Sequence, residues 1–529
     1  MMKRPPTPFL LVLLFSFFSL VLFSPGCGGT AGDGGELPSR LREVIDSTEF
    51  EYATWGIKVV DLASGDELFE PLNPDFMLDP ASTTKLFTVA TGFDVLGADY
   101  TFSTPVYRRG EVDPGGILSG DLILVAGGDL AMGGRGAMEG TIEYTSADHN
   151  DANALGMGEL TEGDPLAGLD DLAAQVAGSG IAEVNGDVII DDRLFGPSRS
   201  FDANEEYIIT PMVINDNLVD LVVKPTQPGN AAEVEWRPLS AAYVVENRVE
   251  TGTGDSEVAL EVYTAEPGVI VAEGLVPEGE GEVVSTYQVE DPASFARTLF
   301  IEALRRAGVV VDAPETGENN AGKLPAKGEY TEAERVALLE SPPFEEYARL
   351  ILKVSHNLGA DTLLYIIAVH EGGQTMQEGL AIERDFLVSA GVDASGLILN
   401  DGQGATGSNL VSAAPAIQLL RYMSTRDDFD VYRGCLPVLG VDGSLAGTLP
   451  DSPARGKVQA KTGTHGGGDA MNNRIVLFAR ALGGYMVTSG GRELAFYIDV
   501  NNVPLDDPEG FKAIIDRHAG IVEILYEEY

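Results

Sequence analysis

The sequence predicts a mixed α/β (α+β) fold that is interrupted by a large β-rich insertion. Two segments, residues 39–99 and 335–529, combine strand-like and helix-like patterns. Residues 100–334 between them hold short strand-like pieces separated by Gly, Asp and Pro turns. A chain of 529 residues is also too long for one hydrophobic core, so we expect several structural units.

The N-terminal residues 1–27 have the pattern of an export signal. Two basic residues near the start precede an apolar run, Phe9–Phe23, that is short for a membrane span. Cys27 follows Ser-Pro-Gly, which leaves two alternatives: lipidation at this cysteine, or an ordinary cleaved signal peptide. We expect a protein exported to the periplasm or to the extracellular face of the membrane, with a flexible linker over residues 28–38.

The first α/β segment, residues 39–99, is predicted from three successive patterns. Residues 36–46 have the apolar spacing of a short amphipathic helix. Residues 54–72 alternate apolar and polar side chains around an Ala-Ser-Gly turn, which is typical of a hairpin. An apolar run with helical character then follows Pro80, a residue that suits the first turn of a helix.

The insertion is predicted to form one or two subdomains. Its strand-like segments include residues 120–129, 185–195 and 217–225. A long Gly-rich stretch contains the sequence DHND, Asp148–Asp151. One His with neighbouring Asp residues has no fixed ligand geometry, so we expect a solvated loop there rather than a cation site.

The segment after the insertion returns to the α/β pattern. Apolar residues recur at helical spacing, two antiparallel strands flank a Ser-Gly-Gly-Arg turn, and a helix closes the chain. The helical segments cover residues 342–372, 375–391, 412–426 and 510–529, and the strand pair covers residues 481–501.

Charge and composition exclude several classes of protein. The chain carries 82 acidic and 34 basic side chains, and a net charge of −48 would repel the phosphates of nucleic acids. Cys27 and Cys435 are its only cysteines, which excludes a disulfide framework and a Cys-rich zinc site. The histidines lack metal-ligand spacing, and no P-loop or dinucleotide-binding fingerprint occurs. We therefore predict no cofactor and no metal.

Three short motifs, each occurring once, point to nucleophilic chemistry. Ser82 and Lys85 form S-x-x-K, and positions i and i+3 share a helix face, so the amine can activate the hydroxyl. Ser355 and Asn357 belong to S-x-N at a predicted helix break, and Lys461 begins K-T-G-T. A helix cap, a turn or a strand end would explain any one motif alone. The three in this order are typical of penicillin-binding proteins and serine β-lactamases.

On these motifs the sequence resembles the D-alanyl-D-alanine carboxypeptidase/endopeptidase family of class C low-molecular-mass penicillin-binding proteins. The resemblance runs from about Glu51 to Asn502 and includes GDLILVAGGD, INDN (Ile214–Asn217), LPVLGVDGSL (Leu436–Leu445) and a large insertion after the first motif. It implies the transpeptidase fold of penicillin-binding proteins and serine β-lactamases for the two α/β segments, which would together form the catalytic domain.

The resemblance also implies a role for each motif residue. Ser82 would be the acylated nucleophile and Lys85 its general base. Ser355 would relay a proton to the leaving amine, and Asn357 would hold the substrate amide.

The K-T-G-T segment is implied to bind the terminal carboxylate of the substrate. Lys461 would supply positive charge there, together with Thr462 and Thr464, and Gly463 belongs to the same substrate-binding segment. The backbone N–H groups of Thr464 and of the nucleophile would form the oxyanion hole.

The sequence departs from the family pattern at three places. His356 stands in the middle of S-x-N, where such enzymes often carry Asn. A segment that usually reads like DGSGLS is here DGQGATGSN, Asp401–Asn409. A Gly-rich stretch that we expect to be flexible follows K-T-G-T.

The predicted function is that of a serine-type D-Ala-D-Ala carboxypeptidase/endopeptidase that acts on peptidoglycan stem peptides through an acyl-enzyme, with β-lactams as inhibitors. A serine β-lactamase is one alternative, although such enzymes are compact and lack a large insertion. A catalytically inactive wall-binding module is another, against which the intact motif set argues.

Overall fold

The computed structural model describes residues 35–137, 140–156, 158–202, 205–505 and 508–529. The expected export signal, Cys27 and most of the expected linker lie outside the described residues. Among the residues that are described, no helix has both the length and the apolar character that a membrane span needs.

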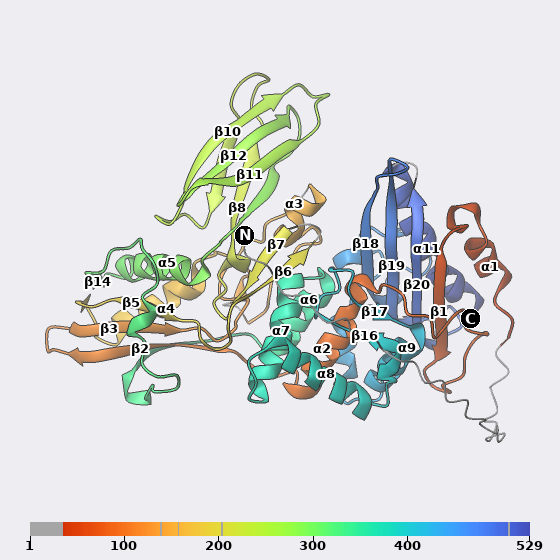
Figure 1. Cartoon of the computed structure of the whole chain (residues 1–529), viewed down its shortest axis with the longest axis horizontal. Helices are drawn as coiled ribbons and strands as arrows, with labels where there is room; N and C mark the ends of the chain where they lie inside the picture. Colours follow the sequence, from red (N-terminus) through yellow and green to blue (C-terminus); the bar gives the residue numbers. More distant parts are fainter. Residues whose placement is uncertain (1–34, 138–139, 157, 203–204, 506–507) are drawn as a thin grey trace, which may run out of the picture.

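The α/β part is built on a four-stranded antiparallel sheet in the order β1-β20-β19-β18 (Figure 1). The strand pair expected around the Ser-Gly-Gly-Arg turn is confirmed as β19 and β20. The hairpin expected at residues 54–72 forms only in part, because β1 pairs along its whole length with β20 and the following segment adds isolated bridges. The strands are β1 Thr54–Asp61, β18 Val458–Asp469, β19 Arg474–Val487 and β20 Glu493–Leu505.

Helices cover both faces of this sheet. The expected first and last helices, α1 (Ser39–Ile45) and α11 (Pro508–Glu528), pack together, and α11 lies on β19 and β20. A larger group of helices packs on the other face and carries two of the three motifs (Figure 1). It comprises α2 Lys85–Val95, α6 Phe344–Lys353, α7 Asn357–His370, α8 Met376–Ser389, α9 Ala413–Met423 and α10 Phe429–Gly434.

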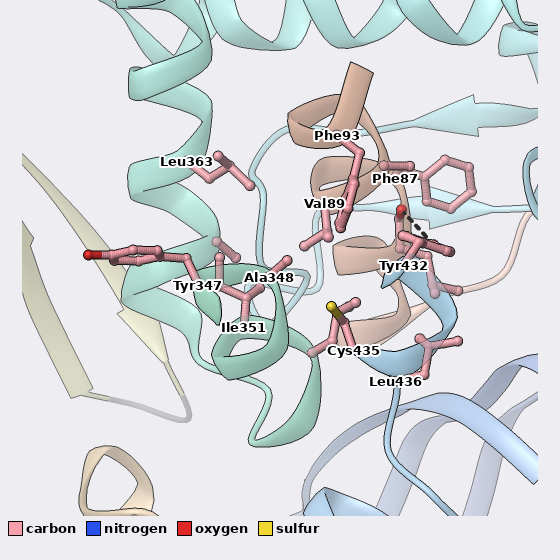
Figure 2. Close-up of a cluster of buried hydrophobic side chains, with 14 of the residues drawn as sticks. Phe87, Val89, Phe93, Tyr347, Ala348, Ile351, Leu363, Tyr432, Cys435 and Leu436 are labelled. Carbon is pink, nitrogen blue, oxygen red and sulfur yellow. Dashed lines mark hydrogen bonds between the residues drawn. The ribbon is translucent and has the colours of Figure 1, made fainter. Parts of the chain in front are cut away.

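A buried cluster of aromatic and aliphatic side chains fixes α2 against its neighbours (Figure 2). Phe93 packs edge-on against both Phe344 and Tyr432, with ring centroids 5.4 and 5.7 Å apart. Cys435 is 1% exposed and lies in the same cluster, so its thiol is a core group rather than a reactive one. This packing sets the position of the helix that begins at Lys85.

The inserted part contains three main sheets and its own hydrophobic core (Figure 1). One sheet has the order β14-β4-β3-β2-β15 with β5 beside β3, another is β13-β8-β9, and a third, β10-β12-β11, projects away from the rest of the molecule. The strands are β2 Ser103–Val112, β3 Ile117–Val125, β4 Glu183–Val184, β5 Val188–Asp191, β8 Leu218–Lys224, β9 Glu233–Arg237, β10 Val244–Gly252, β11 Ala259–Glu266, β12 Val269–Pro277, β13 Val283–Gln288, β14 Val310–Val311 and β15 Arg335–Glu340.

Two features of the inserted part differ from the expectation. It includes two long helices, α4 (Ala167–Gly178) and α5 (Pro292–Arg306), which pack on each other beside the first sheet. Strand β15, expected at the start of the second catalytic segment, pairs with β2. Because a strand belongs to the sheet that satisfies its backbone hydrogen bonds, we propose that the insertion extends to about residue 340.

Candidate active site

Ser82 and Lys85 are brought together by a change of helix type. Ser82 lies in a 3₁₀ turn, Ala81–Thr84, that leads directly into α2, whose first residue is Lys85. Side chains at i and i+3 eclipse in a 3₁₀ turn, and Lys85 Nζ lies 2.9 Å from Ser82 Oγ. Lys85 is completely buried, whereas Ser82 is partly exposed.

Two further contacts orient the Lys85 amine. Its Nζ lies 2.5 Å from Asn357 Oδ1 and 2.7 Å from the backbone carbonyl oxygen of Gln403. A neutral amine has two N–H groups and one lone pair. When the two N–H groups are donated to these acceptors, the lone pair is directed at the Ser82 hydroxyl, as a general base requires.

The segment Asp401–Asn409, whose sequence differs from the family pattern, supplies one of those acceptors, the Gln403 carbonyl. The Asp401 carboxylate folds this loop by accepting hydrogen bonds from Gly404 N–H at 2.7 Å and Asn409 Nδ2 at 2.6 Å. Gly404 has φ +87° and packs against the Ala81 carbonyl oxygen, a conformation and a distance that exclude a side chain. The sequence did not reveal this role, because backbone carbonyls leave no mark in a motif.

The S-x-N motif forms the break between α6 and α7, as expected. Ser355 has φ +65°, an uncommon conformation for a residue with a side chain. Its hydroxyl accepts a hydrogen bond from Lys461 Nζ at 3.0 Å, and Lys461 also donates to the Thr462 carbonyl at 2.8 Å. One lysine therefore links the first motif to the second, and another links the second to the third.

A second buried cation, Arg480, lies beside the K-T-G-T strand. It stands opposite Thr464 in the β18–β19 ladder, and its Nη1 donates to Thr464 Oγ1 at 2.6 Å. Burial lowers the pKa of Arg480 to about 10. Burial and the neighbouring Lys85 and Arg480 likewise lower the pKa of Lys461 well below its ordinary value. Sequence reasoning missed Arg480, although an arginine within the apolar run of β19 was a visible signal.

Close packing brings the K-T-G-T strand to the Ser82 turn. A Cβ atom added at Gly463 would collide with the Pro80 carbonyl oxygen, so only glycine allows this approach. The Gly-rich stretch after the motif is not an irregular flexible segment, since β18 continues through it to Asp469 as a paired strand. His465 in this stretch lies near the Ser82 turn, with its Nδ1 2.6 Å from Oδ2 of Asp79, which precedes that turn.

The first two residues of DHND are buried and the last two are partly exposed, so the expected solvated loop is wrong. Asp148 and His149 are 2% and 4% exposed, and both contact a charged cluster with Arg135, Asp216 and Asp220. Asp148, His149 and Asp216 are close enough together to hold an ion. The Arg135 guanidinium already contacts both of those aspartates, so its charge serves where a cation would, and we propose no metal there.

This cluster should make stability depend on pH. Burial alone would lower the pKa of His149, but Asp220 and Asp216 outweigh it and raise the pKa to about 10. The His149 ion pairs therefore contribute fully below the ordinary value of 6.5 and are lost as the pH rises through 10. We expect His149→Gln to cost about 1.5–3 kcal/mol at pH 6, because Asp220 and Asp216 each lose a charged hydrogen-bond donor and keep only their other partners, Arg237 and Arg135 among them, and much less near pH 10.

Melting temperatures of the wild type and of His149→Gln at pH 6, 8 and 10 measure the pH dependence of this loss in stability. The exposed His370 provides a matched control, and His370→Gln should melt like the wild type at each pH. A His149→Gln deficit of the same size at all three pH values would contradict the ionic role.

A cavity of about 400 Å³ opens beside Asn357, between the start of α7 and the inserted part. Its walls include Tyr207, Asp216 and Tyr287 from the inserted part, and His356 from the S-x-N motif. Ser82 and Lys85 are not among its walls. The cavity therefore adjoins the Ser-Lys pair without containing it, as a subsite for more distant parts of a substrate would.

The chain is similar to known D-Ala-D-Ala carboxypeptidases. Residues 37–522 match the D-Ala-D-Ala carboxypeptidase 3 (S13) family. The chain is 31% identical over 494 residues to a D-alanyl-D-alanine carboxypeptidase of Actinomadura sp., which covers 88% of this chain and 81% of the relative. It is 23% identical over 448 residues to the carboxypeptidase DacB of Haemophilus influenzae, with 82% of each chain covered.

The fold is also similar to a solved structure. Penicillin binding protein 4 (dacB) from Haemophilus influenzae superposes with a TM-score of 0.67 at 20% identity, covering 90% of this chain and 97% of the other. The predicted transpeptidase fold with a large insertion is thereby confirmed. The family match spans all three motifs, and on it the chain belongs to the D-Ala-D-Ala carboxypeptidase 3 (S13) family of serine peptidases.

Proposed function

We propose that Ser82 is the nucleophile with which this carboxypeptidase removes the terminal D-Ala of peptidoglycan stem peptides. The observation that carries the proposal is the contact between Lys85 Nζ and Ser82 Oγ at 2.9 Å, with the amine oriented by Asn357 and the Gln403 carbonyl. A buried amine in this orientation is suited to take the hydroxyl proton.

The reaction proceeds in two halves. Lys85 takes the Ser82 proton as Oγ attacks the carbonyl carbon of the penultimate D-Ala, and the N–H groups of Ser82 and Thr464 stabilise the oxyanion. The C–N bond then breaks, and the leaving D-Ala receives a proton from Ser355, whose hydroxyl is replenished through the lysines that contact this motif. Attack of water on the ester releases the shortened peptide and restores Ser82.

The terminal carboxylate of the substrate is received by the K-T-G-T strand. Thr462 and Thr464 offer hydroxyl groups, and Lys461 and Arg480 offer positive charge next to them. The pKa of Lys461 is lowered in the empty site, but a bound carboxylate favours the charged amine. Asn357 holds the substrate amide, and the adjoining cavity takes the rest of the stem peptide or, in endopeptidase action, part of the neighbouring strand.

Reaction with benzylpenicillin tests the proposal, because a β-lactam acylates the same nucleophile. We expect the intact mass to rise by one drug molecule and the label to reside on the peptide that contains Ser82. Ser82→Ala should abolish the adduct, whereas Ser64→Ala, on an exposed turn, should not. Fast hydrolysis of the drug without a lasting adduct would favour a β-lactamase, and absence of both reactions would favour an inactive wall-binding module.

We also propose that the protein is exported and acts on the outer side of the cytoplasmic membrane, since its family acts on cell-wall peptides. Residues 1–27 support this with their basic start and apolar run, and Cys27 is the candidate site of a lipid anchor. Sequencing of the mature N-terminus decides between the alternatives, since a start beyond Cys27 excludes the anchor.

A further inference from the structure

The turn that carries Ser355 and Asn357 controls both active-site lysines. Ser355 Oγ contacts Lys461 Nζ at 3.0 Å, and Asn357 Oδ1 contacts Lys85 Nζ at 2.5 Å. Ser355 also has a left-handed backbone, with φ +65°. Such a conformation persists only where the surroundings hold it in place. Any displacement of this turn would disturb both lysines together.

His356, between these two residues, ties the turn down at both ring nitrogens. Its side chain is completely buried. Nδ1 accepts a hydrogen bond from Gly359 N–H at 3.0 Å and so caps α7, which leaves the proton of the neutral ring on Nε2. Nε2 then donates to Asp216 Oδ2 at 3.1 Å. The first contact is local, whereas the second reaches into the inserted part of the chain.

Asp216 is itself held rigidly. It belongs to the turn Asn215–Asn217, in which all three residues have positive φ values of 52°, 54° and 56°. The Asn217 side chain bridges the turn by accepting from Ile214 N–H and donating to the Met212 carbonyl. Asp216 also accepts from Arg135 and from His149 at 2.9 Å. A fixed carboxylate of the inserted part thus faces the S-x-N motif.

We propose that Asp216 is a positioning residue for the peptidase reaction. Through His356 it fixes the turn that sets Ser355 on Lys461 and Asn357 on Lys85. The inference rests on the proposed function of these four residues, and it gives the inserted part a role in catalysis. The histidine at the position where the family often carries Asn is long enough to reach the carboxylate as well as to cap the helix.

Two substitutions at His356 separate the two contacts. In His356→Asn the side-chain oxygen lies near the place of Nδ1 and keeps the cap, but the side chain is too short to reach Asp216. In His356→Gln the amide N–H lies near the place of Nε2 and keeps the contact with Asp216, but the cap is lost. The pair therefore compares a variant with the cap only and a variant with the Asp216 contact only.

We expect His356→Gln to retain most of the acylation rate with benzylpenicillin and most of kcat for an acyl-D-Ala-D-Ala peptide. His356→Asn should lose about tenfold to a hundredfold in both, because the reacting groups are misplaced rather than removed. Melting temperatures measured alongside identify any loss that comes from unfolding.

An activity of His356→Asn above that of His356→Gln would overturn the inference, since the helix cap would then be the contact that matters. Equal activity of both variants would also overturn it, whether both match the wild type or both lose equally, because the contact with Asp216 would then make no difference. A wild-type protein that benzylpenicillin does not label on Ser82 would instead overturn the proposed function.

Discussion

Lys85→Ala is expected to slow acylation of Ser82 by benzylpenicillin about 10²–10⁴-fold, the range that a positioned general base contributes. Without the amine, the serine hydroxyl keeps its proton and is a weak nucleophile. Lys85→Arg should be no better, because a guanidinium stays protonated and offers no lone pair to the hydroxyl. Acylation reactions are quenched at successive times, and the fraction of adduct measured by intact-mass spectrometry gives the rate for each variant.

The fold should survive this change. Lys85→Ala leaves the Asn357 side-chain oxygen and the Gln403 carbonyl without this donor, and an unsatisfied buried acceptor costs about 1–3 kcal/mol. A lower melting temperature with a single cooperative transition is therefore expected. Lys58 lies on β1 and pairs with Glu67, away from the three motifs, so Lys58→Ala provides a control that should acylate normally. Near-normal acylation in both Lys85 variants would remove this lysine from the mechanism.

Lys461→Ala is expected to lower kcat/KM for an acyl-D-Ala-D-Ala peptide about tenfold to a hundredfold. A cation beside a carboxylate in a partly desolvated site contributes a charge-assisted hydrogen bond of about 1.5–3 kcal/mol, which corresponds to this loss. The protein as a whole is strongly acidic, with a net charge of −48, so only local cations can attract the substrate carboxylate. The same peptide amidated at its C-terminus lacks the charge and should lose much less.

The pH dependence gives a second test of Lys461. Burial lowers its pKa, so the amine loses its charge at a lower pH than an ordinary lysine. The charged form exists below that pKa, and KM for the acid peptide should therefore rise with pH, but KM for the amide should not. The Lys461→Ala variant should lack the rise. If Lys461→Ala lowers kcat/KM equally for the acid and the amidated peptide, Lys461 does not bind the carboxylate. Arg480 is then the candidate, and kcat/KM of Arg480→Gln for the two peptides tests it.

The motifs were predictable because each is a local pattern with a chemical meaning. Ser82 and Lys85 are three residues apart, and helical geometry alone brings their side chains onto one face. The break at S-x-N and the strand pair near the C-terminus also follow from local periodicity and turn residues. The order of the three motifs pointed to the family, and the family resemblance implied the transpeptidase fold.

Other parts of the site depend on partners that are distant in the chain. The Gln403 carbonyl orients Lys85, and Arg480 contacts Thr464 across a strand ladder. The sequence DHND predicts a solvated loop, because one His with neighbouring Asp residues has no fixed ligand geometry, yet Asp148 and His149 are buried. Its neutralising partner Arg135 is close in the chain, but Asp216 and Asp220 come from a different turn and strand.

The sequence by itself determined the three motifs, the closeness of Ser82 and Lys85, the inserted β-rich part and the main helices. Each of these depends on residue identity over a few turns of chain. The tertiary structure alone decided the pairing of β1 with β20, the continuation of β18 through the Gly-rich stretch, and the link from Asp216 to His356. The physical reason is that buried charges and backbone groups must find partners wherever the fold offers them, and chain order does not record that choice.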